Sequence, residues 1–168
     1  IMLATCVRTI ELVKAQWINV DLDKGIWIVT EDTVKTRRGY VVPLCPTVVS
    51  WFRELKKCAG DSRWVLPARR GHRRARLGGD THVGNSTLWA ALTRRFERGG
   101  LDIRKFTPHD TRSTAKSHMK AMGVTNEVSE RALNHVLKGM EEIYDQYDYL
   151  PERHAALELW AAFLVACE

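Results

Sequence analysis

Residues 107–144 read TPHDTRSTAKSHMKAMGVTNEVSERALNHVLKGMEEIY, a stretch that combines a helix start with several candidate functional side chains. Thr107 is a suitable N-cap, Pro108 suits the first helical position, and Asp110 can close a capping box. The pattern therefore predicts a helix start. His109 then lies in the first turn, beside unpaired backbone N–H groups and the positive end of the helix dipole, where an anion such as phosphate is favoured.

Further polar residues extend this candidate phosphate site. Arg112 lies three residues after His109, so an imidazole and a guanidinium share one face of the predicted helix. His135 follows Asn134, and Tyr144 comes nine residues later. Cationic donors, a second imidazole and a phenol are the parts that phosphoryl transfer without a metal requires. Each feature alone has an ordinary explanation: the His109–Arg112 pair as a capped helix end, His135 as a hydrogen-bonded structural histidine, and Tyr144 as a core residue. Only the combination favours chemistry.

The composition is that of an ordinary folded protein. The chain has 168 residues, 45% of them hydrophobic and 27% charged, which excludes a disordered chain and fits one domain over residues 1–168. The formal net charge of +6 and a sequence pI near 9.3 fit a polyanionic partner, although solvated surface charge explains them equally well.

Several functional classes are disfavoured. The cysteines have neither paired spacing nor regular histidine neighbours, which argues against a zinc site or a disulfide framework and favours a reducing intracellular compartment. No apolar run is long enough for a membrane span, and no signal peptide is recognisable. Ile1 is not an initiator methionine and opens an apolar run, so we expect a C-terminal fragment of a longer protein whose N-terminal domains are absent.

The first part of the chain predicts two helices and a small sheet. Residues 1–6 resemble the end of a buried helix, and a second helix extends to about Gln16. Arg8 lies at the join, where a cation opposes the helix dipole, so it is either a functional residue or a solvent-facing one. Three runs rich in β-branched and aromatic residues then predict an antiparallel sheet with a tight turn after the first run: 17–20, 26–29 and 40–44.

The remainder predicts mainly helices, giving an α+β fold that is mostly α-helical. Thr47 is the expected cap of a helix that reaches Cys58. The arginine-rich segment 68–85 is expected to be a long surface loop, either one that binds backbone phosphate or a disordered tract. Ser86 is expected to cap a helix to about Arg98, with an inward face made of Leu88, Ala91, Leu92 and Phe96. Further helices are expected at 108–122, at 126–133 and from Pro151, the last with an apolar stripe made of Leu157, Trp160, Phe163 and Leu164.

With these residues laid out, the chain resembles the catalytic domain of tyrosine recombinases, the phage-integrase superfamily. The resemblance is greatest to integrases of prophages and genomic islands, and it rests on VRTIELVKAQW, VKTRRGYVVPL, FTPHDTRSTA, ERALNHV and YDYLPERHAALELWA. It implies six catalytic positions, which are Arg8, Lys35, His109, Arg112, His135 and Tyr144. Departures occur at Cys6, Thr111, Ser113 and Asn134, none of which is a catalytic position.

The resemblance implies that the protein cuts and rejoins DNA through a covalent 3′-phosphotyrosine, with Tyr144 as nucleophile and no metal or cofactor. Integration or excision of a mobile element would be the outcome. The implied partners are double-stranded DNA attachment sites, further copies of the chain in a homotetramer, and accessory DNA-bending proteins, in the bacterial cytoplasm or nucleoid. Three alternatives stay open: Tyr147 or Tyr149 as nucleophile, a type IB topoisomerase, and a DNA-binding module without catalysis.

Overall fold

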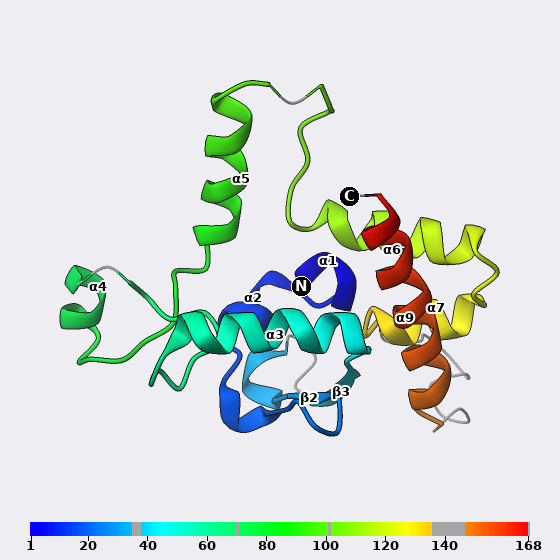
Figure 1. Ribbon diagram of the computed structural model, residues 1–168, viewed down its shortest axis with the longest axis horizontal. Coiled ribbons are helices and arrows are strands. Elements are labelled where there is room, and N and C mark those ends of the chain that lie inside the picture. Colours follow the sequence, from blue (N-terminus) through cyan, green and yellow to red (C-terminus); the bar gives the residue numbers. More distant parts are fainter. Residues whose placement is uncertain (35–37, 70, 101, 136–146, 168) are drawn as a thin grey trace.

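The computed structural model describes residues 1–34, 38–69, 71–100, 102–135 and 147–167. A three-stranded sheet and an all-helical part lie side by side (Figure 1). Within the described ranges, no helix is both long and apolar enough to cross a membrane. In chain order the elements are α1 (Met2–Thr5), α2 (Thr9–Val13), the 3₁₀ helix η1 (Trp17–Asn19), β1 (Val20–Asp21), β2 (Ile26–Val29), the 3₁₀ helix η2 (Glu31–Thr33), β3 (Tyr40–Pro43), α3 (Pro46–Ala59), α4 (Gly71–Arg76), α5 (Thr87–Glu97), α6 (Asp110–Ala121), α7 (Asn126–Ala132) and α9 (Leu150–Ala166).

The sheet is antiparallel and three-stranded, as predicted, and its strand order is β1-β2-β3. Trp27 of β2 pairs with Val42 of β3, and both are buried. Ile28, the next residue along β2, is 46% exposed, while Val29 is buried again. This alternation is what a half-buried antiparallel strand requires, because successive side chains point to opposite faces.

The turn before β2 forms where the sequence predicts it. The Asp21 side chain accepts the backbone N–H groups of Asp23 at 3.1 Å and Lys24 at 2.9 Å. Gly25 has φ +64°, and a Cβ atom there would lie 2.8 Å from the carbonyl oxygen of Leu44. Glycine is therefore required by both the backbone conformation and the close approach of the chain after β3.

Two predicted boundaries in the first part of the chain are wrong. The first strand was expected over 17–20, but residues Trp17–Asn19 form η1. The chain there pairs outside the sheet: Gln16 forms a bridge with Trp64, and the N–H of Trp17 donates to the Arg63 carbonyl at 2.9 Å. Thr47 is not the cap of α3, since Cys45 holds the N-cap position and the proline that follows it opens the helix. Proline suits that position because its missing N–H would have no partner there.

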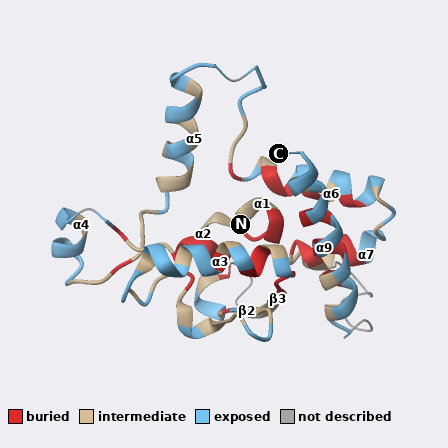
Figure 2. Cartoon of the chain, in the orientation of Figure 1, coloured by how far each residue is buried: buried red, intermediate tan, exposed pale blue. Residues whose placement is uncertain are grey.

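Two hydrophobic cores meet along α9 (Figure 2). The sheet-side core joins the sheet, α2 and α3, and there Phe52 packs on Trp27 with ring centroids 5.9 Å apart. The helical core joins α6, α7 and α9 and is centred on Trp160, whose Nε1–H donates to the Leu3 carbonyl at 2.9 Å. The predicted packing of α9 on its own domain is confirmed for Leu157 and Trp160. Phe163 is 37% exposed and stacks on Trp160 at the surface instead.

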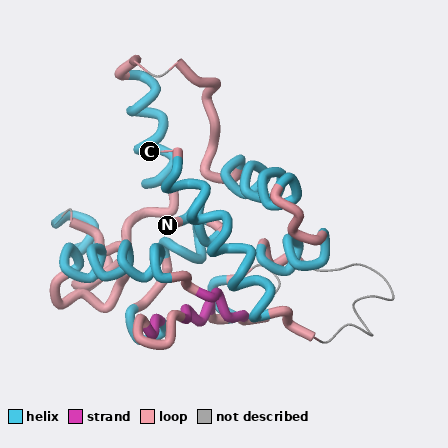
Figure 3. The backbone as a smooth tube through the Cα atoms, turned by 45° about the vertical axis from the view of Figure 1, so that its right-hand side comes forward, coloured by secondary structure: helices cyan, strands magenta, loops and turns pink. Residues whose placement is uncertain are grey.

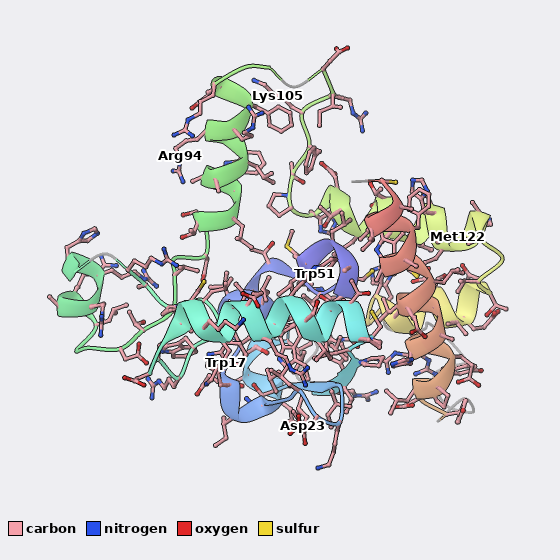
Figure 4. All side chains as sticks on the ribbon, viewed as in Figure 1. Trp17, Asp23, Trp51, Arg94, Lys105 and Met122 are labelled. Atoms are coloured by element: carbon pink, nitrogen blue, oxygen red, sulfur yellow. The ribbon has the colours of Figure 1, made fainter. Side chains whose placement is uncertain are left out.

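The predicted inward face of the helix after Ser86 is wrong. No residue of α5 is buried, Ala91 is exposed, and both views show the helix standing away from the body of the molecule (Figures 1 and 3). At its far end the ring of Phe96 packs edge-on against Phe106, in the connection that leads to α6, with ring centroids 5.5 Å apart. Figure 4 shows Arg94 and Lys105 at this projecting edge. An apolar period predicts an amphipathic helix, but it does not say whether the chain itself covers the apolar face.

The segment 68–85 is not simply a loop, because it contains α4. Its base is closed by hydrogen bonds from the Ala68 N–H to the Thr81 carbonyl at 2.8 Å and from the Val83 N–H to the Leu66 carbonyl at 2.9 Å. Arg73 of α4 then donates through Nε to the His82 carbonyl at 2.9 Å. Arg73 therefore stabilises the folded form of this segment.

Candidate active site

Arg112, on the first turns of α6, is only 3% exposed. Its Nη1 donates to the carbonyl of Cys6, and its Nη2 donates to the carbonyl of Leu133. Cys6 is the C-cap of α1 and Leu133 is the C-cap of α7, so both acceptors belong to helix ends, where carbonyl groups lack partners within the helix. A buried guanidinium from α6 therefore joins the C-terminal ends of two other helices.

Arg8 is the N-cap of α2, where its charge opposes the helix dipole, and Glu11 compensates for it. The Arg8 N–H donates to Glu11 Oε2 at 2.6 Å, and Arg8 Nη1 lies 3.0 Å from Glu11 Oε1. Glu11 is 1% exposed, and its Oε2 also accepts the hydroxyl of Tyr40 at 2.9 Å. Arg8 Nη2 is left to donate to the Asn134 carbonyl at 3.2 Å. The arginine is therefore aimed at the end of α7.

His135 follows α7 in a well-defined turn. Asn134 adopts the left-handed conformation with φ 48°. Its N–H donates to the Arg131 carbonyl at 3.0 Å, and the His135 N–H donates to the Glu130 carbonyl at 3.0 Å. These two bonds are the Schellman pattern that ends many helices, usually with glycine and sometimes with asparagine in the left-handed position. The backbone of His135 is thereby held directly against the helix end.

The two arginines and His135 come together at this end of α7. Arg112 and Arg8 donate to the carbonyls of the consecutive residues Leu133 and Asn134, immediately before His135. Burial lowers the pKa of Arg112, and the charge of Arg8 lowers it further. Burial also lowers the pKa of His135, with Arg112 and Arg8 acting in the same direction and Glu130 opposing them. A cluster of cationic donors of this kind is chemically suited to an anion such as phosphate.

His109 lies at the N-terminal end of α6, and the predicted reciprocal hydrogen bonds between Thr107 and Asp110 form just before it. The Thr107 N–H donates to Asp110 Oδ2 at 2.7 Å, and the Asp110 N–H donates to Thr107 Oγ1 at 3.3 Å. Regular α-helix begins at Asp110, and His109 is exposed at its N-cap position, so the predicted N-cap at Thr107 and first helical residue at Pro108 are each two residues too early. The Arg112 N–H donates to the His109 carbonyl at 3.1 Å, so one turn separates the exposed imidazole from the buried guanidinium.

Two of the six predicted site residues, Lys35 and Tyr144, lie outside the described residues. The two rival tyrosines are described. Tyr147 is 52% exposed and its hydroxyl donates to Glu152 at 3.2 Å; desolvation and that carboxylate raise its pKa, which opposes formation of a nucleophilic phenolate. Tyr149 is the N-cap of α9, where its φ of 55° and its ring contact with Tyr147 indicate a structural role.

The sequence did not point to Tyr40 and Glu130, which support this cluster, or to Arg153, which joins α9 to β3. The Tyr40 hydroxyl donates a further hydrogen bond to Glu11, and Oε2 of Glu130 lies 2.5 Å from Nδ1 of His135. Arg153 of α9 is buried and donates through Nη2 to the Val41 carbonyl of β3. The sequence carries no signal for this last contact, because Arg153 lies between Glu152 and His154 in a polar first turn of the helix.

The fold and this cluster together define an α+β domain with a basic site at the junction of three helices. The chain belongs to the phage integrase family, whose model matches residues 1–150. It is 26% identical to the prophage integrase IntZ of Escherichia coli (strain K12) over 162 residues, and 25% identical to the integrase of Enterobacteria phage P4. Each match covers 96% of this chain, which spans only 37% and 38% of those two proteins.

Solved structures confirm the predicted tyrosine-recombinase fold. The crystal structure of XerA recombinase matches with a TM-score of 0.61 at 18% identity, over 90% of this chain and 53% of that one. The integrase of the Tn1549 transposon, solved in complex with circular intermediate DNA, matches with a TM-score of 0.61 at 15% identity, over 94% of this chain and 55% of that one.

Proposed function

We propose that this chain is the catalytic domain of a site-specific DNA recombinase, which cuts and rejoins double-stranded DNA for the integration or excision of a mobile element. One observation carries the proposal: Arg8 and Arg112, 104 residues apart in a chain of 168, donate to the carbonyls of adjacent residues beside His135. Membership of the phage integrase family supports the same activity.

In the proposed reaction the Tyr144 hydroxyl oxygen attacks the scissile phosphorus. A 3′-phosphotyrosyl bond forms as the bond to the 5′ oxygen breaks, and Lys35 supplies the proton to that leaving oxygen. Arg8 and Arg112 offset the charge that builds on the non-bridging oxygens, an effect for which the loss of one donor commonly costs about 10²–10³ in rate.

The remaining steps need no external energy source. His109 and His135 assist proton transfer or hold the phosphate. One phosphate ester is exchanged for another of similar energy, so a 5′ hydroxyl from the partner strand reverses the attack without a cofactor. The proposed partners are DNA attachment sites, three further copies of the chain in a tetramer, and accessory DNA-bending proteins, all in the bacterial cytoplasm or nucleoid. The net charge of +6 suits such a polyanionic substrate.

The test is covalent capture on nicked suicide duplexes taken from both junctions of the mobile element. The wild-type chain should form a denaturation-resistant protein–DNA adduct, and Tyr144→Phe should form none. Tyr147→Phe is the matched control and should retain the adduct. An adduct from Tyr144→Phe would overturn the assignment of the nucleophile. A gel shift without any adduct would identify a binding module, and relaxation of an unrelated supercoiled plasmid would identify a topoisomerase.

A further inference from the structure

Glu130 is placed to control the orientation of His135. The carboxylate lies one turn before the end of α7, and its Oε2 is 2.5 Å from Nδ1 of His135. The carbonyl of the same residue accepts the His135 N–H at 3.0 Å. Both the backbone and the ring of His135 are therefore tied to Glu130.

The second carboxylate oxygen of Glu130 is held from another helix. Oε1 accepts a hydrogen bond from Nζ of Lys116 on α6, the helix that also carries Arg112. Burial acts to raise the pKa of Glu130, but the hydrogen bonds from Lys116 and His135 outweigh it and hold the pKa below its ordinary value. Glu130 is thus an ionised acceptor with one oxygen assigned to each partner.

This arrangement selects one form of the imidazole. A carboxylate only accepts hydrogen bonds, so Nδ1 must carry the proton, and in the neutral ring Nε2 is then the unprotonated nitrogen. We propose that Glu130 is a positioning residue for the recombinase reaction: together with Lys116 it fixes the ring plane and the Nδ1–H tautomer of His135, and leaves Nε2 as the nitrogen that faces the substrate. The inference rests on the proposed function, because it assigns His135 a role in that reaction.

Because Lys116 binds the other carboxylate oxygen, the conservative substitution Glu130→Gln tests whether Glu130 sets the tautomer of His135. In Glu130→Gln the amide has only one acceptor oxygen, and an ammonium group, which can only donate, will take it. The NH₂ group then faces Nδ1, which must become an acceptor, so the ring changes to the Nε2–H tautomer. Removing the ammonium in the double variant Glu130→Gln/Lys116→Met lets the amide turn its oxygen back to Nδ1–H.

The primary measurement is the ¹⁵N chemical shifts of the His135 ring at pH 8 in the 168-residue chain. A protonated ring nitrogen and an unprotonated one have different ¹⁵N chemical shifts, so the spectrum identifies the tautomer. We expect Nδ1–H in the wild type, Nε2–H in Glu130→Gln, and Nδ1–H restored in the double variant. Glu127→Gln, an exposed carboxylate on the same helix, is the matched control and should leave the ring unchanged. If Glu130 and Lys116 only stabilised the fold, the double variant would disturb the His135 ring more than Glu130→Gln does. Recovery of the Nδ1–H tautomer in the double variant would contradict that explanation.

The second measurement is single-turnover adduct formation at saturating DNA. Glu130→Gln should slow the cleavage step by roughly 10–100-fold, the cost commonly found when a residue that orients a metal-binding histidine is lost, with DNA affinity unchanged. The double variant should recover part of that loss. Unchanged cleavage in Glu130→Gln, or an Nδ1–H ring in both variants, would overturn the inference. If the wild type forms no adduct, the proposed function fails, while the ring spectra still decide whether Glu130 sets the tautomer.

Discussion

Removal of one hydroxyl group tests the physical basis of the arginine arrangement. Tyr40 Oη donates to Glu11 Oε2 at 2.9 Å, and Glu11 in turn binds the backbone and side chain of Arg8. Because Glu11 is 1% exposed, water does not replace a lost partner easily. Tyr40→Phe keeps the ring that packs against the sheet-side core and deletes only the donor.

The expected loss follows from the charge of the acceptor. A hydrogen bond to an ionised group contributes about 1.5–3 kcal/mol to the free energy of unfolding. In a chain of this size about 1 kcal/mol corresponds to roughly 2–4 °C, so the midpoint should fall by about 3–12 °C. Urea and thermal unfolding measure both quantities. Tyr147→Phe, which deletes a hydroxyl bonded to Glu152 at an exposed site, should stay within about 0.5 kcal/mol of the wild type.

The pH dependence provides an independent check of the same contact. Burial, together with the neighbouring Glu11 carboxylate, raises the pKa of Tyr40 well above its ordinary value of 10.0. A raised folded-state pKa contributes stability that is complete below the unfolded value and is lost as the pH rises above it. The stability gap between the wild type and Tyr40→Phe should therefore be constant from pH 6 to about 9 and narrow above about 10.

Two results would refute this reasoning. One is a loss of stability in Tyr40→Phe no larger than that in Tyr147→Phe, which would mean that the hydroxyl contributes nothing net. The other is a gap that widens above pH 10, which would mean that the fold favours the ionised phenol.

Two further predictions concern the end of α7. Asn134 has φ 48°, so Asn134→Ala should lower the free energy of unfolding by about 1 kcal/mol, whereas Asn134→Gly should be nearly neutral because glycine adopts the left-handed conformation freely. Urea unfolding checks this, and equal stabilities of the two variants would contradict it. Burial lowers the pKa of His135 from 6.5, so protonation favours the unfolded chain and stability should be lost as the pH falls below about 6.5. His135→Gln should show a shallower acid slope between pH 6.5 and 5 in the same assay, and parallel slopes would show that the imidazole makes no such contribution.

Local features were predictable because their causes act over a few residues. The reciprocal hydrogen bonds between Thr107 and Asp110 and the tight turn at Gly25 formed as expected, since each depends on hydrogen bonds or dihedral angles within one turn of chain. The cap of α3 was wrong by two residues, because Thr47 and Cys45 flank a proline and only the path of the chain after β3 decides between them.

The inward face expected of α5 shows a different limit. Its apolar period is genuine, and Leu88 does pack at the edge of the sheet-side core, yet no residue of the helix is buried. Periodicity reports which side of a helix is apolar. It contains no information on whether another part of the same chain covers that side, because burial depends on distant segments.

For the candidate site, the sequence by itself determined the residue types and a shared helix start for His109 and Arg112. Only the tertiary structure decided that Arg8 reaches the carbonyl of Asn134 across 126 residues of chain, and that Arg112 joins the carbonyls of Cys6 and Leu133. The physical reason is that buried polar groups need hydrogen-bond partners. When α1, α6 and α7 pack, the free carbonyls at the helix ends are satisfied by guanidinium groups from distant parts of the chain, and that packing is non-local.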